Sequence, residues 1–327
     1  MKLAILGAGA WGTALATSFV QSRHDVVLWT RDREDCATLA RTRASRYLKG
    51  IELPAAVRVE AELAAALADR ELVIVATATA GLRDTVKALR AVTSSPALLW
   101  ACKGFETQTR ELPHQVVAAA LPRAHQVAAL SGPSFALEVA RGQPTALVCA
   151  SSDARFAAST AAALNSSRLR IYSSADVAGV ELGGALKNVI AIAAGISDGL
   201  ELGRNARAAL VTRGLAEMTR LGVAMGGKPE TFAGLAGVGD LVLTCTGELS
   251  RNREVGVRLA QGKPLDAVLG ELGHVSEGVA SARAALEHAR ARKVELPIAE
   301  AVCGVLFEGL APREAVQQLL SRDPRAE

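Results

Sequence analysis

The most constraining feature of this chain is a glycine-spaced turn close to its beginning. The apolar run Leu3–Leu6 is long enough for a buried parallel strand, and it leads into Gly7, Gly9 and Gly12, spaced as G-x-G-x-x-G. In a strand–turn–helix unit, Gly7 forms the tight turn, Gly9 lets a pyrophosphate reach the backbone, and Gly12 lets the helix pack against the strand. The helix expected from Ala10 onward would point its N–H groups at the phosphates. The segment therefore favours a dinucleotide-binding unit.

The same segment has a second interpretation. Met1 and Lys2, followed by an apolar run to Val20 with Ala14-Leu15-Ala16 in place of a cleavage site, are also typical of a secretory signal peptide. The single positive charge, the small residues that interrupt the run and a second strand pattern directly downstream favour the dinucleotide-binding unit instead.

Composition restricts the classes of protein that remain. A length of 327 residues predicts two domains, and 50% hydrophobic with 21% charged residues is an ordinary balance for a globular protein. The net charge of +4 comes from Lys and Arg that are scattered along the chain, and only 3% of residues are aromatic, so a nucleic-acid groove is not indicated. This charge is compatible with an anionic small-molecule partner.

Cysteine and histidine usage points to a reducing compartment. The cysteines are odd in number, widely spaced and without a C-x-x-C pair, which predicts reduced core residues in a cytoplasmic protein: Cys36, Cys102, Cys149, Cys245 and Cys303. The histidines show no metal-ligand spacing, so we expect no metal site. No uncharged apolar run approaches the length of a transmembrane segment.

Strand and helix patterns divide the chain into two parts. Strands are expected at 25–30, 57–59, 72–77, 97–101, 127–130, 146–150 and 169–172, with helical segments between them. From Asp176 the pattern is helical, near 176–198, 205–222, 228–235, 251–261, 276–291, 298–308 and 312–321. We therefore predict an α/β chain, with a dinucleotide-binding domain over 1–175 (a Rossmann-type, doubly wound, mostly parallel sheet) and an all-α substrate-binding and catalytic domain over 176–327.

The end of the second strand bears on cofactor choice. An NAD-specific unit usually places an acid there for the adenosine ribose, but this chain has Thr30-Arg31-Asp32. Arg31 suits a 2′-phosphate or a position over the adenine, and Asp32 suits a helix N-cap. The alternative for Arg31 is a solvated loop charge, and its position favours a cofactor contact.

Two further polar segments follow strand ends, where ligands of parallel sheets bind. Lys103 follows the strand at 97–101, although an ordinary turn lysine is an alternative. The loop Ser131–Ala136 follows the strand at 127–130, and Pro133 suits the first position of a helix, which would offer its N-terminus to an anion.

Lys187 is the candidate for proton transfer. Together with Asn188 it interrupts one of the most apolar stretches of the helical part. A buried lysine is costly unless it is paired or functional, and Gly183 and Gly184 one turn earlier would leave room for a ligand. The alternative is a lysine whose charged end reaches solvent from the edge of a core helix.

Two further candidate site segments lie in the helical part: one contains a single acid, and the other is a helix start with basic residues. Asp240 lies in an apolar, glycine-rich segment, either as a partner that orients the lysine or as an N-cap. Ser250 suits the N-cap of a helix that begins with Arg251-Asn252-Arg253. Positive charge is disfavoured at a helix N-terminus, so two arginines there suggest that an anion such as phosphate binds nearby.

At this point the chain resembles the bacterial-type NAD(P)-dependent glycerol-3-phosphate dehydrogenases along nearly its whole length. The matching segments occur in one order: GAGAWGTALA from Gly7, Lys103-Gly104, Ser131–Ala136, Leu186–Ile190, Ala208–Gly214, Gly234–Leu241, Leu249–Asn252 and Glu277-Gly278.

The resemblance implies a reversible reduction of dihydroxyacetone phosphate to sn-glycerol 3-phosphate with NADP or NAD, for phospholipid synthesis. It implies Lys187 as the proton donor and acceptor, and a substrate site lined by Lys103, Gly132, Ser134, Lys187, Asp240, Ser250, Arg251 and Asn252. It implies cofactor contacts from Ala10, Trp11, Arg31, Lys103, Ala136, Arg251, Val275 and Glu277. Some members carry Ser where Ala10 stands, so only a backbone contact would persist there. A homodimer is an open alternative to a monomer.

Two other functions remain open from the sequence. One is another two-domain reductase with a catalytic lysine, acting on a hydroxyacid or ketoacid whose carboxylate replaces the phosphate. The other is a dinucleotide-binding sensor without catalysis, in which the lysine of the apolar helix would have no explanation.

Overall fold

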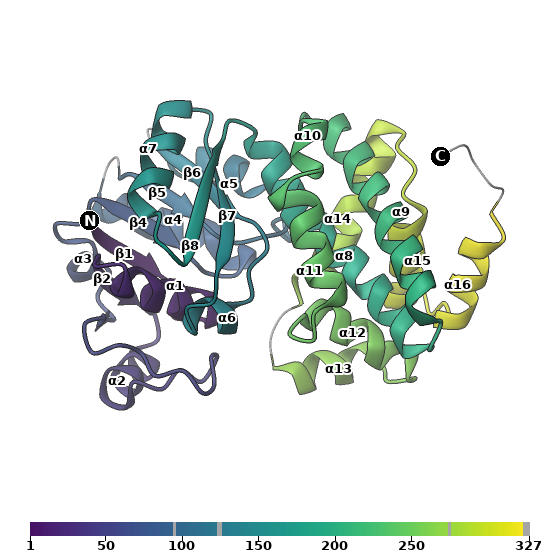
Figure 1. The fold of residues 1–327 in the computed structure, drawn as a ribbon, viewed down its shortest axis with the longest axis horizontal. Coiled ribbons are helices and arrows are strands. Elements are labelled where there is room, and N and C mark those ends of the chain that lie inside the picture. Colours follow the sequence, from purple (N-terminus) through teal and green to yellow (C-terminus); the bar gives the residue numbers. More distant parts are fainter. Residues whose placement is uncertain (94–95, 123–125, 274–275, 323–327) are drawn as a thin grey trace. The chain divides into compact units, whose positions relative to one another are not determined.

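The computed structural model describes residues 1–93, 96–122, 126–273 and 276–322, and the chain forms two compact units, Met1–Val180 and Glu181–Glu327 (Figure 1). The first unit contains the strands and the second is helical, which confirms the predicted α/β fold class. The boundary between the units lies in the first turn of a long helix, α8 (Val177–Gly199).

Unit 1 is built on an eight-stranded sheet, counted over the described residues, with the order β3-β2-β1-β4-β5-β6-β7-β8. Its first six strands in sequence run parallel, β7 runs antiparallel to β6, and β8 runs parallel to β7. The strand order reverses direction at β1 and β4, and this switch point is where doubly wound sheets bind ligands. The strands are β1 Lys2–Leu6, β2 Asp25–Trp29, β3 Arg58–Glu60, β4 Leu72–Val75, β5 Leu98–Trp100, β6 Val127–Ser131, β7 Thr145–Ala150 and β8 Leu169–Ser174.

Helices of unit 1 connect these strands. Two helix pairs pack together, α1 with α6 and α4 with α5, and α7 packs against strand β8. One boundary prediction is wrong, because the helix after β6 begins at Ala136 with Phe135 as its N-cap, and Pro133 lies in the loop before it. The helices are α1 Ala10–Gln21, α2 Arg33–Thr42, α3 Leu63–Leu67, α4 Leu82–Val92, α5 Pro113–Ala120, α6 Ala136–Ala140 and α7 Ala154–Leu164, with a 3₁₀ turn η1 at Thr79–Gly81.

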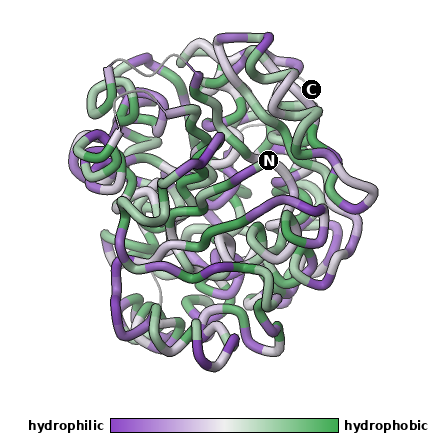
Figure 2. The backbone as a smooth tube through the Cα atoms, turned by 90° about the vertical axis from the view of Figure 1, so that its left-hand side faces the viewer, coloured by the Kyte–Doolittle hydropathy of each residue, from purple (hydrophilic) through white to green (hydrophobic). Residues whose placement is uncertain are grey.

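The strands of unit 1 read as continuous apolar runs because both faces of the sheet are covered. Leu3, Ile5, Leu28 and Ile74 are completely buried in its core. Figure 2 colours the chain by hydropathy and shows green apolar segments that alternate with purple hydrophilic ones. This core fixes the strand ends that carry the candidate ligand-binding residues.

Unit 2 consists of the following helices in the described residues: α8, α9 Gly203–Ala224, α10 Pro229–Phe232, α11 Asp240–Thr246, α12 Arg251–Ala260, α13 Leu265–Leu272, α14 Glu277–Arg292, α15 Pro297–Phe307 and α16 Pro312–Leu320. A π-helical turn at Leu235–Gly239 (η2) precedes α11. The sequence analysis missed α11 and α13. Glycines around 234–239 argue against a helix there, but a Cβ at Gly237 would lie 2.1 Å from the Phe232 carbonyl oxygen, so close packing requires glycine.

Helix α8 is long and apolar enough to cross a membrane, yet 83% of its apolar 18-residue window is buried inside the protein, as in the core helix of a globular domain. Its glycines serve packing. A Cβ at Gly183 would lie 2.2 Å from the Ala236 carbonyl oxygen, and one at Gly195 would lie 1.9 Å from the Arg253 carbonyl oxygen. The prediction that Gly183 leaves room for a ligand is therefore wrong, since the backbone before α11 fills that space.

Candidate active site

The glycine turn between β1 and α1 has the geometry that a pyrophosphate requires. Gly7 has φ +119°, and a Cβ there would lie 2.9 Å from the Ala76 carbonyl oxygen. A Cβ at Gly12 would lie only 1.8 Å from the Gly7 carbonyl oxygen, so helix and strand approach at backbone contact. A Cβ at Gly9 would meet nothing within 4 Å, so its backbone faces open space at the N-terminus of α1. These residues fit a dinucleotide phosphate.

The first turn of α1 presents backbone rather than side chains. The indole of Trp11 packs beside Ala14, Leu48 and Val139, and its buried Nε1 has no hydrogen-bond partner in the described parts of the chain. Ala10 has no polar side chain. Any polar cofactor contact of Ala10 therefore comes from its backbone, which lies in the first turn of α1, where N–H groups lack intrahelical acceptors.

Two charged residues follow β2, and they differ in role: Asp32 caps a helix, whereas Arg31 is exposed. Asp32 is the N-cap of α2, as predicted, and its Oδ1 accepts hydrogen bonds from Glu34 N at 2.9 Å and Asp35 N at 3.0 Å. These backbone hydrogen bonds, that from Asp35 above all, lower the pKa of Asp32. Arg31 beside it is exposed. The exposed guanidinium of Arg31 is a cation at this strand end and suits a 2′-phosphate, which the Asp32 carboxylate would repel.

The ends of β5 and β6 meet at the carbonyl of Gly132. That oxygen accepts hydrogen bonds from Lys103 Nζ at 2.9 Å and from Ser134 Oγ at 3.1 Å. Gly132 has φ +134°, and a Cβ there would lie 3.1 Å from the Ala146 carbonyl oxygen, which restricts the position to glycine. Three predicted substrate residues are thus brought together in unit 1, with Ala136 following at the start of α6.

Lys187 and Asp240 form a buried ion pair in unit 2. Lys187 on α8 is 7% exposed and Asp240 at the start of α11 is 0% exposed. Lys187 Nζ donates to Asp240 Oδ1 at 2.5 Å and to Thr244 Oγ1 at 3.0 Å. The interpretation of Lys187 as a lysine that reaches solvent is wrong, because its charged end is enclosed with the acid. Its ammonium group is instead held in one orientation by two oxygens.

Thr244 is a member of this site that the sequence analysis missed. Its hydroxyl donates to the Asp240 carbonyl oxygen at 2.6 Å, which leaves an oxygen lone pair directed at Lys187. Spacing contained the signal, since residues four apart lie on one face of a helix. The helix at 240–246 was not among the predicted helices, although the N-cap alternative for Asp240 implies a helix that starts there.

Asn252 links three helices beside Lys187. Its Nδ2 donates to Asn188 Oδ1 at 2.9 Å, and its Oδ1 accepts from Ser276 Oγ at 2.5 Å and from Gly278 N at 3.1 Å. This amide therefore ties α8 and α12 to the start of α14, where Glu277 is the first helical residue. The predicted cofactor residue Val275 lies outside the described residues.

The start of α12 separates its two arginines. Ser250 is the N-cap, as predicted, and its Oγ accepts from Arg253 N at 3.3 Å. Arg253 Nε donates to Asp198 Oδ2 at 2.6 Å, so this guanidinium is paired inside the protein. Arg251 is exposed at the first helical position. Of the two arginines, Arg251 therefore remains the candidate for binding an anion, and Arg253 does not.

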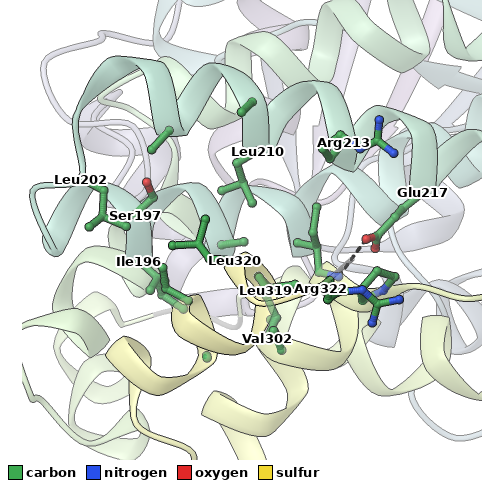
Figure 3. A pocket seen from close by; sticks show the side chains of 18 of the residues that line it. Ile196, Ser197, Leu202, Leu210, Arg213, Glu217, Val302, Leu319, Leu320 and Arg322 are labelled. Carbon is green, nitrogen blue, oxygen red and sulfur yellow. Dashed lines mark hydrogen bonds between the residues drawn. The ribbon is translucent and has the colours of Figure 1, made fainter. Parts of the chain in front are cut away.

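A cavity of about 580 Å³ lies elsewhere in unit 2, between α8, α9, α15 and α16 (Figure 3). Its walls include Ile196, Leu210 and Val302, and the described residues that line it do not include Lys187, Asp240 or Thr244. Glu217 at its charged end accepts hydrogen bonds from Ile298 N at 2.8 Å and Ala299 N at 3.3 Å, and therefore caps α15. Burial raises the pKa of this carboxyl to about 7.

Comparison with known proteins shows one family over both units. The family model for the N-terminal region of NAD-dependent glycerol-3-phosphate dehydrogenase matches residues 2–157, and the model for its C-terminal region matches residues 176–317. A glycerol-3-phosphate dehydrogenase [NAD(P)+] of Burkholderia lata is 58% identical, and one of Thiobacillus denitrificans is 57% identical, each alignment covering 100% of both chains.

A solved structure gives the same result. The crystal structure of glycerol-3-phosphate dehydrogenase from Coxiella burnetii is 39% identical, has a TM-score of 0.93, and matches over 98% of this chain and 99% of that one. The resemblance seen in the sequence is thereby confirmed. The chain belongs to the NAD-dependent glycerol-3-phosphate dehydrogenase family.

Proposed function

We propose that this protein catalyses the reversible reduction of dihydroxyacetone phosphate to sn-glycerol 3-phosphate, with NADPH or NADH. The observation that carries the proposal is the buried Lys187, held by Asp240 and Thr244, in a chain that also contains a dinucleotide-binding turn. Residues 1–175 serve as the dinucleotide-binding domain, and residues 176–327 supply the catalytic lysine and the anion site.

Cofactor binding rests on unit 1. The turn at Gly7, Gly9 and Gly12 and the N-terminus of α1 receive the pyrophosphate, and Arg31 receives the adenosine end. When bound, the reduced nicotinamide supplies a hydride to the carbonyl carbon of the substrate. Because Arg31 is cationic and occupies the place of the usual acid, we expect NADPH to be accepted well and NADH to remain usable.

Lys187 moves the proton. As hydride reaches the carbonyl carbon, the carbonyl oxygen becomes an alkoxide, and the Lys187 ammonium group donates a proton to it. Asp240 and Thr244 keep the lysine side chain in one rotamer, which lowers the entropic cost of reaching the reacting oxygen. In the reverse reaction the neutral amine accepts the hydroxyl proton, and the adjacent Asp240 carboxylate favours the ammonium that results.

The substrate phosphate is held at the start of α12. Arg251 offers a planar fork of donors, and the first-turn N–H groups add positive potential. Ser250 and Asn252 shape this position through the hydrogen bonds already described. Lys103, Gly132 and Ser134, which share one carbonyl in unit 1, are proposed as further substrate residues through the family resemblance.

An NADPH-oxidation assay tests the proposal, with dihydroxyacetone phosphate, unphosphorylated dihydroxyacetone and a 2-ketoacid as parallel substrates. We expect turnover with the phosphate ester and little with the other two. Preference for the ketoacid would instead assign a carboxylate-binding reductase. NADPH binding without turnover of any of the three would assign a sensor.

We also propose that the product supplies the glycerol backbone of phospholipids, in the cytoplasm. All five cysteines are buried and none forms a disulfide, as is typical of proteins in a reducing compartment. Labelled glycerol phosphate should fall in cells depleted of this protein, and exogenous glycerol phosphate should restore lipid synthesis. Unchanged labelling after depletion would contradict this role.

A further inference from the structure

An ion-pair network outside the proposed chemistry surrounds the turn after β5. Arg83, on α4, donates from Nε to Glu106 Oε1 at 2.7 Å and from Nη2 to Glu106 Oε2 at 2.6 Å. The same Nη2 also donates to Glu111 Oε2 at 2.8 Å, and Thr109 Oγ1 donates to Glu106 Oε2 at 2.5 Å. The Arg83 guanidinium thus joins both ends of the segment 106–111 to helix α4.

This segment is closed on itself as well. Glu106 N donates to the Glu111 carbonyl oxygen at 2.9 Å, and Arg110 N donates to the Glu106 carbonyl oxygen at 2.8 Å. Glu106 is only 5% exposed, a degree of burial that a carboxylate tolerates only when it is paired and hydrogen-bonded. The bidentate geometry is the arrangement in which an arginine specifies position as well as charge.

Lys103 precedes this closed segment by three residues. Between them stands Gly104, whose φ of +133° suits glycine and gives the turn little conformational resistance of its own. The Lys103 side chain is long and flexible, yet its Nζ reaches the Gly132 carbonyl oxygen at the end of β6. The turn that carries Lys103 is joined to α4 three residues further along the chain, through the Arg83–Glu106 pair.

We propose that Arg83 and Glu106 are positioning residues for Lys103. Their pair holds the turn after β5 so that the lysine is pre-organised for the cofactor and substrate. The proposal rests on the proposed role of Lys103 in ligand binding. Neither Arg83 nor Glu106 need touch a ligand, because a small displacement of a ligand-binding group is enough to reduce binding and turnover strongly.

The test is a double-mutant cycle on folded protein. Arg83→Met, Glu106→Gln, Lys103→Met and the Arg83→Met/Lys103→Met pair are compared for NADPH Kd, followed by fluorescence, and for kcat and KM with dihydroxyacetone phosphate. Glu106→Gln keeps the side-chain shape and leaves no buried carboxylate unpaired, so it covers the case in which Arg83→Met fails to fold. Arg83→Lys tests the two-point hydrogen bonding of the guanidinium to Glu106, since a lysine ammonium keeps the charge but restores this geometry only in part.

Arg70→Met is the matched control. The Arg70 side chain is also largely buried in unit 1, and it pairs with an acid, Asp25, at 3.0 Å. Asp25 is the first residue of β2 and Arg70 lies just before β4, so this pair is at the amino ends of the strands, whereas Lys103 follows the carboxyl end of β5. This variant should lower the unfolding temperature and leave Kd and KM unchanged.

We expect Arg83→Met and Glu106→Gln each to raise NADPH Kd or substrate KM about 10-fold or more, the scale on which positioning acts. In the Lys103→Met background, Arg83→Met should add less than about 2-fold, because there is no lysine left to position. Full multiplicative effects in the double variant, or wild-type constants in both single variants, would overturn the inference. Wild-type constants in Lys103→Met would instead contradict the proposed role of that lysine.

Discussion

The sharpest test of the proposed chemistry is Lys187→Met, which keeps side-chain length and removes the ammonium group. Loss of a positioned acid–base group typically costs about 10²–10⁴ in rate. We expect kcat to fall by that factor for dihydroxyacetone phosphate reduction and for glycerol 3-phosphate oxidation. NADPH affinity should stay within a few-fold of wild type, since the proposed cofactor residues of unit 1 are unchanged.

The structure also predicts a cost in stability. Lys187 Nζ lies 2.5 Å from an oxygen of Asp240, which is 0% exposed, so the methionine variant leaves a buried carboxylate without its counter-ion. Breaking a buried pair in this way costs about 3–5 kcal/mol of the free energy of unfolding. Thr244 Oγ1, 3.5 Å from Asp240 Oδ1, recovers part of that cost if its hydroxyl turns toward the acid.

The assay therefore uses Lys187→Met, Asp240→Asn and the pair Lys187→Met/Asp240→Asn. Urea unfolding should show that the pair is more stable than Lys187→Met alone, because no buried charge is left unpaired. In both lysine variants kcat should be reduced by about 10²–10⁴ while NADPH still binds. Near-normal kcat in a folded Lys187→Met protein would refute the acid–base role. Joint loss of NADPH binding and activity would show that the lysine holds the cofactor instead.

Three further predictions concern single side chains. Arg31→Ala should raise KM for NADPH more than KM for NADH in steady-state kinetics, and an equal rise in both would contradict a 2′-phosphate contact. Arg251→Ala should lower kcat/KM for dihydroxyacetone phosphate by about 2 kcal/mol in transition-state free energy, the scale of a charge-assisted contact, with partial recovery in Arg251→Lys; an unchanged value would place the phosphate elsewhere. Glu217 has a folded-state pKa of about 7, raised from 4.5 by burial, so the folded protein holds its proton more tightly than the unfolded chain does. Its contribution to stability therefore falls as pH rises from about 4.5 to 7, and Glu217→Gln should gain in relative stability across this range, by up to about 3 kcal/mol, in urea titrations at fixed pH values; a pH-independent difference between the two proteins would exclude this carboxyl as the titrating group.

Much of the fold follows from patterns that lie within a few consecutive residues. The turn at Gly7–Gly12 can be recognised from its own glycine spacing and the apolar strand before it. The structure adds the reason for each glycine, since a Cβ at Gly12 would meet the nearby Gly7 carbonyl oxygen, whereas one at Gly7 would meet the distant Ala76 carbonyl oxygen. The strands of unit 1 were predicted for a related reason, since a strand covered on both faces is apolar along its whole length. Asp32 and Ser250 as N-caps belong to the same class.

Helices α11 and α13 show where local patterns were misread. Leu265–Leu272 stands between Pro264 and Gly273, and Gly273 ends the helix with φ +66°, so the sequence carries both a start and a stop signal for α13. For α11 the local sequence argued against a helix, because several glycines directly precede it. Its preceding glycines are tolerated because they allow contacts as short as the one between Gly237 and Phe232, a gain that appears only in the packed unit.

The sequence by itself determined that a dinucleotide-binding sheet precedes a helical region with one lysine in an apolar helix. Only the tertiary structure decided what surrounds that lysine. Asp240 lies 53 residues away along the chain, and the same packing separates Arg253, which pairs with Asp198, from Arg251, which is exposed. The physical reason is that a buried charge requires a partner but does not specify which one. The partner is chosen by the helices that pack together, and that choice is made by contacts spread over the whole unit.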